Sequence, residues 1–489
     1  MVQDFSRDML KPRNRLCEFQ GVLQNSGSLK GWHWIQELKV LDENPANIKG
    51  LPILHSGFVD AHIHLSWMGE QLVSLQAPSF STAEFLRDEF SKRFQNGTKE
   101  IEIAYNFQES LWLNGAQTPQ NILAGLPKIQ PWILFRLCGH RALVSEEVLR
   151  RSGLNPQAKS CEWVDGGKIF ELYGWLEVQR APKIADFVLR AQESLLLSGY
   201  SGVSDMAWDS GKVAAILNLH QDGKLLIDVA GVLLAGRAPE IEAKGPFWNE
   251  AGIKNSVTSL KTVVTCRHWK KFLDGSFGAR TAWLSQPYSD APDEYGRDLC
   301  EIRELIGEAE SAMAAGFHLS FHAIGDSAID RIIEVEEMLQ NIVSSRRRMS
   351  VQQGLPATWH RIEHGQLIRP EQLEILAESK NWMICSQPYH RVMDQSFIKD
   401  RLGPDRMNDV YRFGSLNRGG LPAVLSSDGP IGSCRPEEVL KSVLNDERES
   451  ERLSADQLLW LFTRGSRALI GLPDRSPLPG TFAWITEQA

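Results

Sequence analysis

The sequence predicts a (β/α)8 TIM barrel of the α/β class, with a small companion domain and an inserted segment after the first strand. Eight short apolar or β-branched runs each end in polar side chains, and most of them precede a helix-compatible stretch. Alternating strands and helices indicate parallel βα units. The chain, at 489 residues, is long enough for one barrel with additions. The eight runs are 57–64, 202–206, 225–234, 269–274, 318–322, 359–364, 383–387 and 423–428.

The interval between the first two runs predicts the insertion. It spans about 135 residues, whereas a βα unit needs only about 30. We place the inserted segment at about 66–183, which includes apolar stretches of its own at 101–112 and 132–137. The barrel then occupies 57–472, which leaves residues 1–56 and 473–489 outside it.

Composition argues against several kinds of partner. The net charge of −8 disfavours nucleic acid, which requires a basic face, and no apolar run approaches the roughly 20 residues of a membrane span. The seven cysteines include no CxxC pair, which favours a reducing compartment over a disulfide framework. With no signal-peptide pattern at the N-terminus, we expect a cytoplasmic protein that acts on a small molecule. The sequence does not decide whether the protein forms a homodimer.

The first run ends in two histidines that lie on one face of a strand. His62 and His64 share that face because strand side chains alternate. Two neutral imidazoles on one side can bind one metal ion, although the pair alone also fits two half-buried strand histidines. Asp60 favours the metal site, since carboxylates often orient metal-binding histidines from behind.

Two later runs also end in a histidine, at His322 and His364, and each has a second histidine four residues earlier. Four residues span about 13 Å along a strand. Only the C-terminal histidine of each run can therefore reach the mouth of the barrel, where active sites lie. We expect structural roles for His318 and His360.

Two further residues are ambiguous when each is considered alone. Asp428 follows an apolar run, where an acid is costly unless paired or metal-bound, but the Gly-Pro after it equally suits an aspartate in a turn. Lys270 lies in a segment that is otherwise an ordinary strand and turn. Nearby cations favour its neutral amine, and a neutral amine can add carbon dioxide to form a carbamate, an anionic oxygen ligand.

In combination and in this order, these pieces resemble the amidohydrolase superfamily. Within it, the chain is most similar to amidohydrolase family 3, the group of the YtcJ-like metal-dependent hydrolases and N-substituted formamide deformylase. The resemblance runs from about Gly57 to Leu472, and it implies that residues 1–56 with 473–489 form a small, reduced β domain from both termini. It rests on GFVDAHIH from Gly57, KKFLDGSFGARTAWLSQPYSD from Lys270, HAIGDSAID from His322, RIEHGQLI from Arg361, SQPYH from Ser386 and SSDGP from Ser426.

The resemblance implies a centre for one or two divalent metal ions, with zinc first. Lys270, rather than Lys271, would be a carbamate that bridges two metals. Asp428 would contact a metal and also handle the proton. The implied metal ligands are His62, His64, Lys270, His322, His364 and Asp428.

The resemblance also extends to the substrate. Within the insertion, RLCGHRALVS from Arg136 resembles the group's Arg-x-x-Gly-His segment, and Glu177 resembles its partner acid. We therefore expect Arg136, His140 and Glu177 to bind the substrate. His390 either lines the pocket or is a histidine of a surface loop.

The implied activity is hydrolysis of a non-peptide C–N bond, of the amide or formamide type, by metal-activated water with Asp428 as general base. The first alternative is a deaminase of the same superfamily that acts on a small amine or heterocycle. Such deaminases resemble one another in having a glutamate three residues after the histidine of the fifth strand. That histidine is His322 here, and this chain has Gly325 at the position of the glutamate. The second is a catalytically inactive barrel used as a binding protein, although all six ligand positions are filled. The sequence does not identify the substrate.

Overall fold

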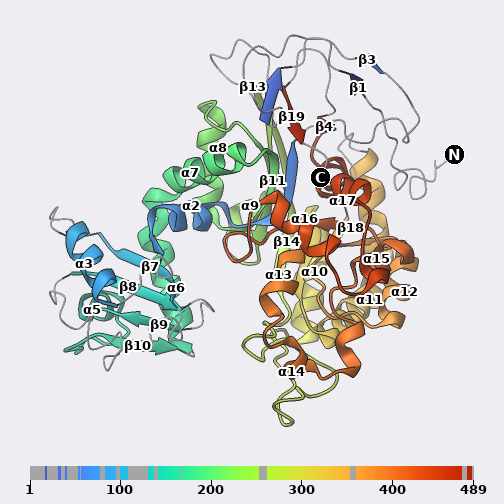
Figure 1. Ribbon diagram of the computed structural model, residues 1–489. Helices are drawn as coiled ribbons and strands as arrows, with labels where there is room; N and C mark the ends of the chain where they lie inside the picture. The colour runs from blue at the N-terminus through green and yellow to red at the C-terminus, as the bar shows by residue number, and fades with distance from the viewer. Residues whose placement is uncertain are drawn as a thin grey trace. The chain divides into compact units, whose positions relative to one another are not determined.

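The computed structural model divides into two compact units, described here one at a time (Figure 1). The first comprises Met1–Leu65 and Leu189–Ala489, and the second comprises Ser66–Val188, the range in which the inserted segment is predicted. No helix of the described chain is long and apolar enough to cross a membrane. The structure describes the strands at 17–18, 31–34, 39–40 and 53–55 and the ranges 57–76, 83–94, 100–107, 130–136, 141–165, 167–252, 261–352, 359–475 and 482–486.

Eight parallel strands of the described residues form a nearly closed barrel in the first unit. A parallel bridge between Ile63 and Gly429 links the segment after the last strand to the first strand. The eight strands overlap the eight predicted runs, so the predicted (β/α)8 barrel is confirmed. In spatial order they are β5 (Phe58–Ile63), β11 (Tyr200–Trp208), β12 (Asp228–Leu234), β14 (Lys261–Phe272), β15 (His318–Ala323), β16 (His360–His364), β17 (Trp382–Ser386) and β18 (Ala423–Leu425).

Helices connect these strands and cover the barrel from outside (Figure 1). Their ends follow local capping chemistry. In α10, for example, the Glu301 side chain accepts the first free N–H groups and Gly316 ends the helix in a left-handed conformation. The helices of this unit include α7 (Ile184–Leu197), α8 (Ser210–Gln221), α9 (Pro239–Lys244), α10 (Ile302–Ala315), α11 (Asp326–Gln352), α12 (Pro370–Ser379), α13 (Pro388–Asp394), α14 (Ile398–Leu402), α15 (Phe413–Gly419), α16 (Pro436–Leu444), α17 (Ala455–Leu461) and α18 (Arg464–Ile470).

The two ends of the chain meet in a small antiparallel sheet. β19 (Phe482–Thr486) pairs with both β2 (Gly31–Trp34) and β4 (Ile53–His55). A second pairing joins β1 (Cys17–Glu18) to β3 (Lys39–Val40), and β13 (Phe247–Gly252) forms a hairpin with β14. The prediction of β structure drawn from both termini is therefore confirmed.

The alternation of residues in β5 decides which side chains enter the barrel. Every residue of this strand is buried. Val59 and Ala61 pack in one apolar cluster with Leu469 and Ile470 of α18, on the outside of the strand. Because neighbouring side chains of a strand point to opposite faces, the polar residues between them face the barrel interior.

The second unit is a sheet with helices on both faces. In the described part of this unit, β6 (Leu75–Gln76), β7 (Glu102–Phe107) and β8 (Trp132–Arg136) are parallel, and β9 (Arg141–Val144) and β10 (Glu162–Asp165) continue the sheet antiparallel. One face packs on α3 (Ala83–Phe94), and the other packs on α5 (Glu146–Ser152) and α6 (Gly167–Arg180). α2 (Leu65–Val73) follows β5 and enters this unit.

Candidate metal centre

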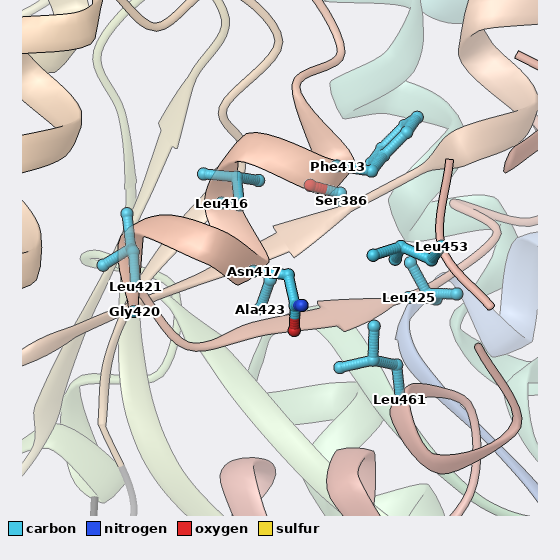
Figure 2. Close-up of a pocket in the computed structure, with 10 residues that line it drawn as sticks. All are labelled: Ser386, Phe413, Leu416, Asn417, Gly420, Leu421, Ala423, Leu425, Leu453 and Leu461. Carbon is cyan, nitrogen blue, oxygen red and sulfur yellow. The ribbon is translucent and has the colours of Figure 1, made fainter. Parts of the chain in front are cut away.

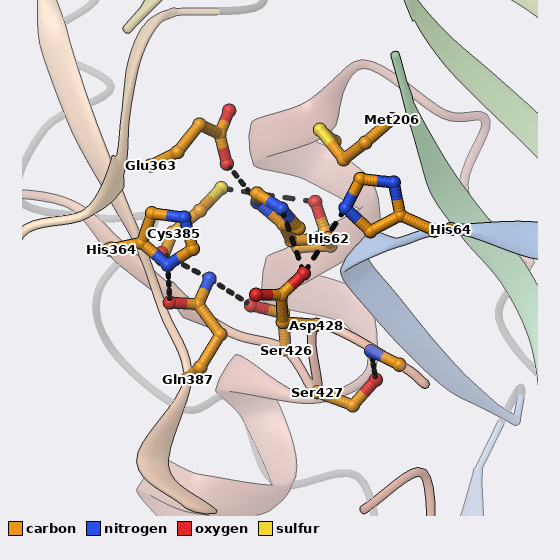
Figure 3. Close-up of polar contacts among 12 residues, drawn as sticks. His62, His64, Met206, Glu363, His364, Cys385, Gln387, Ser426, Ser427 and Asp428 are labelled. Carbon is orange, nitrogen blue, oxygen red and sulfur yellow. Dashed lines mark hydrogen bonds and ion pairs between the residues drawn. The ribbon is translucent and has the colours of Figure 1, made fainter. Parts of the chain in front are cut away.

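The centre is built around Asp428, which lies against His62 of β5 and His64, the residue that directly follows this strand (Figure 3). Its Oδ1 atom lies 3.3 Å from Nε2 of His62 and 3.3 Å from Nε2 of His64. One ligand atom each of His62, His364 and Asp428 lie within 4.8 Å of one another. The structure thus brings together donors from the first, sixth and last strands of the barrel.

Backbone hydrogen bonds at the barrel seam fix Asp428 in this position. The Asp428 N–H donates to the carbonyl oxygen of His62 over 2.8 Å, and the His64 N–H donates to that of Gly429 over 2.8 Å. Asp428 has a left-handed backbone, with φ +56°, which is uncommon for a residue with a side chain. Such conformations cost roughly 1–3 kcal/mol and gather at functional sites.

His322 and His364 approach from β15 and β16. Their ring centroids are 4.4 Å apart, and the His364 centroid lies 5.0 Å from that of His62. The earlier histidines of the same strands, His318 and His360, are buried with ring centroids 5.3 Å apart, and His360 Nδ1 accepts the Leu319 N–H. These contacts agree with the structural roles expected for them.

Hydrogen bonds on the far side of each imidazole determine which nitrogen faces the centre. Nδ1 of His62 donates to Glu363 over 2.6 Å, and Nδ1 of His364 donates to Oε1 of Gln387 over 2.7 Å. Nε2 of His322 donates to the carbonyl oxygen of Gly275 over 3.1 Å. The lone pairs left for a metal are therefore on Nε2 of His62, Nε2 of His364 and Nδ1 of His322.

These donors fit a metal ion. Among the described residues, His62 Nε2, His322 Nδ1 and Asp428 Oδ1 are buried atoms with no hydrogen-bond partner. Buried polar atoms are rarely left unpaired, and imidazole nitrogen with carboxylate oxygen is the donor set that zinc prefers. His62, His364 and Asp428 each offer a ligand atom within 4.8 Å of the other two, so this group fits one divalent cation.

Glu363 orients His62, a role that the sequence reasoning missed. Its carboxylate also accepts from Ser320 Oγ over 2.6 Å and pairs with Nε of Arg361 at 2.8 Å. Arg361 is fully buried and reaches Ser204 on β11 and the Ala61 carbonyl oxygen on β5. A charged pair at alternate positions of a predicted barrel strand was the signal that could have revealed this network.

Asp60 was expected to orient a metal-binding histidine, and the structure corrects this expectation. Its Oδ1 atom accepts the backbone N–H groups of His62 and Ser427, each over 3.1 Å, and does not contact an imidazole. Asp60 therefore joins the first strand to the segment that carries Asp428. Orientation of the ring belongs to Glu363, which comes from another strand.

Two consecutive residues of β16 serve the centre because the backbone turns at the strand end. In a regular strand, Glu363 and His364 would point to opposite faces. His364 has a left-handed backbone with φ +76°, so its ring also reaches the centre. Gln387 holds this ring, and its Nε2 donates to Ser426 Oγ and to the Cys385 carbonyl oxygen, which fixes its Oε1 toward His364 (Figure 3).

The two adjacent lysines of β14 have different environments. Lys270 is buried, with Nζ 4.8 Å from the centroid of the Phe272 ring, which itself lies 4.9 Å from that of His322. Lys271 instead pairs with Glu308 of α10, outside the barrel. Burial lowers the pKa of Lys270, which favours the neutral amine that a carbamate requires.

The charge around the donors favours a cation. Burial raises the pKa of Asp428, but His62, His64 and His364 outweigh it and hold that pKa well below its usual range. Burial lowers the pKa of His322 to about 3 and holds that of His364 well below its usual range, so both rings are neutral, as ligation requires. The pKa of His62 is raised, because Asp428 and Glu363 outweigh burial and Lys270.

The four residues with an expected substrate role fall in different places. His390 is buried at the centre, with Nε2 3.7 Å from Asp428 Oδ2, so it is not a surface loop histidine. Arg136 ends β8 and Glu177 is exposed on α6, and both belong to the second unit. His140 lies outside the described residues. The substrate roles of these residues stay predictions.

An apolar pocket on the barrel exterior is separate from this centre (Figure 2). It lies beside β18, between α15 and α17, and none of its lining residues is a candidate ligand. Its walls are apolar apart from a serine and an asparagine. The lining residues are Ser386, Phe413, Leu416, Asn417, Gly420, Leu421, Ala423, Leu425, Leu453 and Leu461.

Comparison with known proteins identifies the family. Residues 53–483 match the model of the amidohydrolase family. The chain is 24% identical over 481 residues to the putative amidohydrolase YtcJ of Bacillus subtilis, a match that covers 92% of this chain and 85% of the relative. It is also 24% identical over 429 residues to protein LONG AFTER FAR-RED 3 of Arabidopsis thaliana, covering 80% of this chain and 68% of that protein.

Two solved structures of metal-dependent hydrolases superpose on most of this chain. An uncharacterised metal-dependent hydrolase from Pyrococcus horikoshii superposes with a TM-score of 0.72 at 25% identity, over 90% of this chain and 86% of that one. A similar hydrolase from Pyrococcus furiosus has a TM-score of 0.73 at 24% identity, over 90% and 88%. With the family model covering most of the sequence and the barrel carrying a metal-binding set of donors, the chain belongs to the amidohydrolase family.

Proposed function

We propose that this protein hydrolyses the C–N bond of a small N-acyl or N-formyl amine with the help of a bound divalent metal ion. The observation that carries the proposal is the buried group of His62, His364 and Asp428, whose ligand atoms lie within 4.8 Å of one another. Family membership and the metal-dependent hydrolases of the same fold support the coarser part, a metal-dependent hydrolase. The finer part of the proposal is the type of bond that is hydrolysed and the path that the proton takes.

Six side chains would hold one or two metal ions, with zinc as the first choice. A bound divalent ion supplies Lewis acidity, which lowers the pKa of water towards neutrality and polarises a carbonyl group. The low pKa and burial of Lys270 support its use as a carbamate. The proposed ligands are His62, His64, Lys270 as its carbamate, His322, His364 and Asp428.

Asp428 is the proposed general base and acid. Its pKa lies well below the usual range, so its carboxylate is ionised and can take a proton from the attacking water. Its Oδ2 atom faces His390, while Oδ1 faces the β5 histidines. Asp428 then returns the proton to the nitrogen that leaves. Arg136, His140 and Glu177 are proposed to bind the rest of the substrate.

The local structure at Gly325 argues against the deaminase alternative. A Cβ atom built on Gly325 would lie 2.0 Å from the carbonyl oxygen of Trp283, and the Gly325 N–H donates to Asp274 over 2.7 Å. No side chain fits there without a shift of backbone. A glutamate three residues after His322 is therefore excluded on packing as well as on sequence.

The test combines metal analysis with a substrate panel. We expect at least one transition metal per chain after purification, its loss in a His62→Ala/His64→Ala double variant, and turnover of at least one N-formyl or N-acyl amine by the parent. His220→Ala, a buried histidine bonded to the Thr262 carbonyl oxygen, is the matched control and should keep its metal. A double variant with full metal content would remove this pair from the ligand set. A metal-loaded parent that turns over no amine but deaminates a heterocycle would refute the proposed bond.

A further inference from the structure

His390 presents a buried nitrogen to the centre without being one of its proposed ligands. It lies in the first turn of α13, 8% exposed, with its ring stacked on that of His364 at 6.0 Å between centroids and 15° between planes. Its Nε2 atom lies 3.7 Å from Asp428 Oδ2, beyond hydrogen-bond distance. Among the described residues, this nitrogen has no hydrogen-bond partner.

Gln366 determines which nitrogen of His390 carries the proton. Gln366 Nε2 lies 3.1 Å from His390 Nδ1 and donates to it, so Nδ1 accepts and the proton of the neutral ring is on Nε2. Gln366 is itself buried, and its backbone carbonyl oxygen accepts the Tyr411 N–H over 2.8 Å. The ring therefore directs a fixed N–H donor toward Asp428.

This arrangement excludes two other roles for His390. A protonated Nε2 has no lone pair for a metal, and for the same reason it cannot take the proton of the attacking water. An unpaired buried donor costs roughly 1–3 kcal/mol, and a catalytic role is one of the explanations for such a group in a native structure. A hydrogen-bond acceptor beside Asp428 would be the partner of this donor.

We propose that His390 is a catalytic residue whose Nε2–H donates to the substrate carbonyl oxygen as that oxygen becomes negative during attack at the carbonyl carbon. The proposal rests on the proposed amide hydrolysis. It adds to that reaction a hydrogen-bond donor that comes from the barrel unit. The N–H bond stays intact: the carbonyl π bond shifts onto oxygen while water bonds to carbon, and the proton of the water goes to Asp428. Gln366 acts as a positioning residue.

The kinetic test uses the zinc-loaded full-length protein. Removal of a fixed donor to an oxyanion costs about 10²–10³ in kcat, so His390→Ala should show that loss, with KM little changed because the bond strengthens only during attack. Gln366→Leu, which keeps the bulk and frees the tautomer, should lose about 10-fold. His220→Ala is the control and should match the parent, and metal content should be equal in all four proteins.

An equilibrium measurement separates this proposal from the reaction itself. Methylphosphonate is a tetrahedral anion that resembles the species formed on attack, and its dissociation constant can be measured by calorimetry. His390→Ala should weaken its binding about 10- to 100-fold, as for loss of a hydrogen bond to a charged group. If the parent hydrolyses no amide, the proposed function fails while this titration still decides on the donor. A parent that binds methylphosphonate no more tightly than His390→Ala would overturn the proposal, as would an His390→Ala enzyme within threefold of parental kcat.

Discussion

The imidazole of His62 and the carboxylate of Glu363, 301 residues apart in the chain, share a 2.6 Å hydrogen bond inside the barrel. Burial raises the pKa of Glu363, but Arg361 and His62 outweigh it and hold that pKa well below its usual range. The carboxylate is thus an ionised acceptor that fixes the tautomer of His62. A histidine held in this way is a stronger metal ligand than a free one.

Glu363→Gln should therefore weaken metal binding. Glutamine can still accept from Nδ1 but lacks the negative charge, and loss of such a supporting group typically costs about 10- to 100-fold in metal affinity. The measurement is a competition titration with a chromophoric chelator. Glu336→Gln is the matched control, because Glu336 is also buried and bonds Asn381 and Trp382 away from the centre. Equal metal affinity in both variants would show that Glu363 only stabilises the barrel.

Asp428→Asn should retain metal and fold but lose turnover. Asparagine tolerates the left-handed backbone of this position and keeps an oxygen ligand, yet it cannot take a proton. Loss of a general acid/base lowers the rate by about 10²–10⁴. Asp446→Asn, another buried acid that bonds Arg448 instead, should leave kcat unchanged. A metal-replete Asp428→Asn enzyme within a few-fold of the parent would assign the proton transfer to another group.

The lysine pair offers a test of the carbamate. Lys270→Ala should abolish turnover, and short carboxylic acids should restore part of it by supplying the missing oxygen ligand. Lys271→Ala should keep most activity, since its ion pair with Glu308 lies outside the barrel. The readout is kcat with and without added formate, acetate or propionate. The opposite behaviour of the two variants would show that the register of β14 is wrong.

Phe272 should influence which substituent the substrate carries. Its ring is 37% exposed, next to His322 and Lys270 at the C-terminal end of β14. Full burial of such a side chain is worth about 1.5–3 kcal/mol, so partial burial against an apolar substituent corresponds to about 10-fold in kcat/KM. Phe272→Ala should lose about that factor on an N-benzyl amide and little on an N-methyl one. Met338→Ala, an exposed apolar residue of α11, should lose neither, and equal losses on both amides would remove Phe272 from substrate binding.

The fold was predictable because each strand carries its own signal. Apolar runs that end in polar residues identified all eight barrel strands, and the spacing of His62 and His64 placed both at the mouth. The choice of Lys270 over Lys271 came from the family pattern. In the structure Lys270 is buried and Lys271 is partly exposed. These features are local, so a single segment of sequence is enough to reveal each one.

The supporting residues of the centre were not predictable in the same way. Glu363, Gln387 and Gln366 act through partners on other strands or on the loops that follow them, so their own segments do not show which groups they contact. Asp60 was expected to contact an imidazole, but it accepts backbone N–H groups instead. Strand alternation predicts which face of the sheet a side chain takes, but not which group that side chain contacts. The left-handed turn at His364, which lets two neighbours face the centre, breaks the alternation rule itself.

The seam between β5 and the segment after β18 has a consequence for how the protein is made. The donors of the centre come from near residue 62 and near residue 428, and the backbone bonds between His62 and Asp428 that fix them span this seam. On a ribosome the N-terminal histidines emerge long before their partner carboxylate. We therefore expect the cation to be captured late, after the last strand has closed the ring, so that acquisition of metal reports completed synthesis of the barrel.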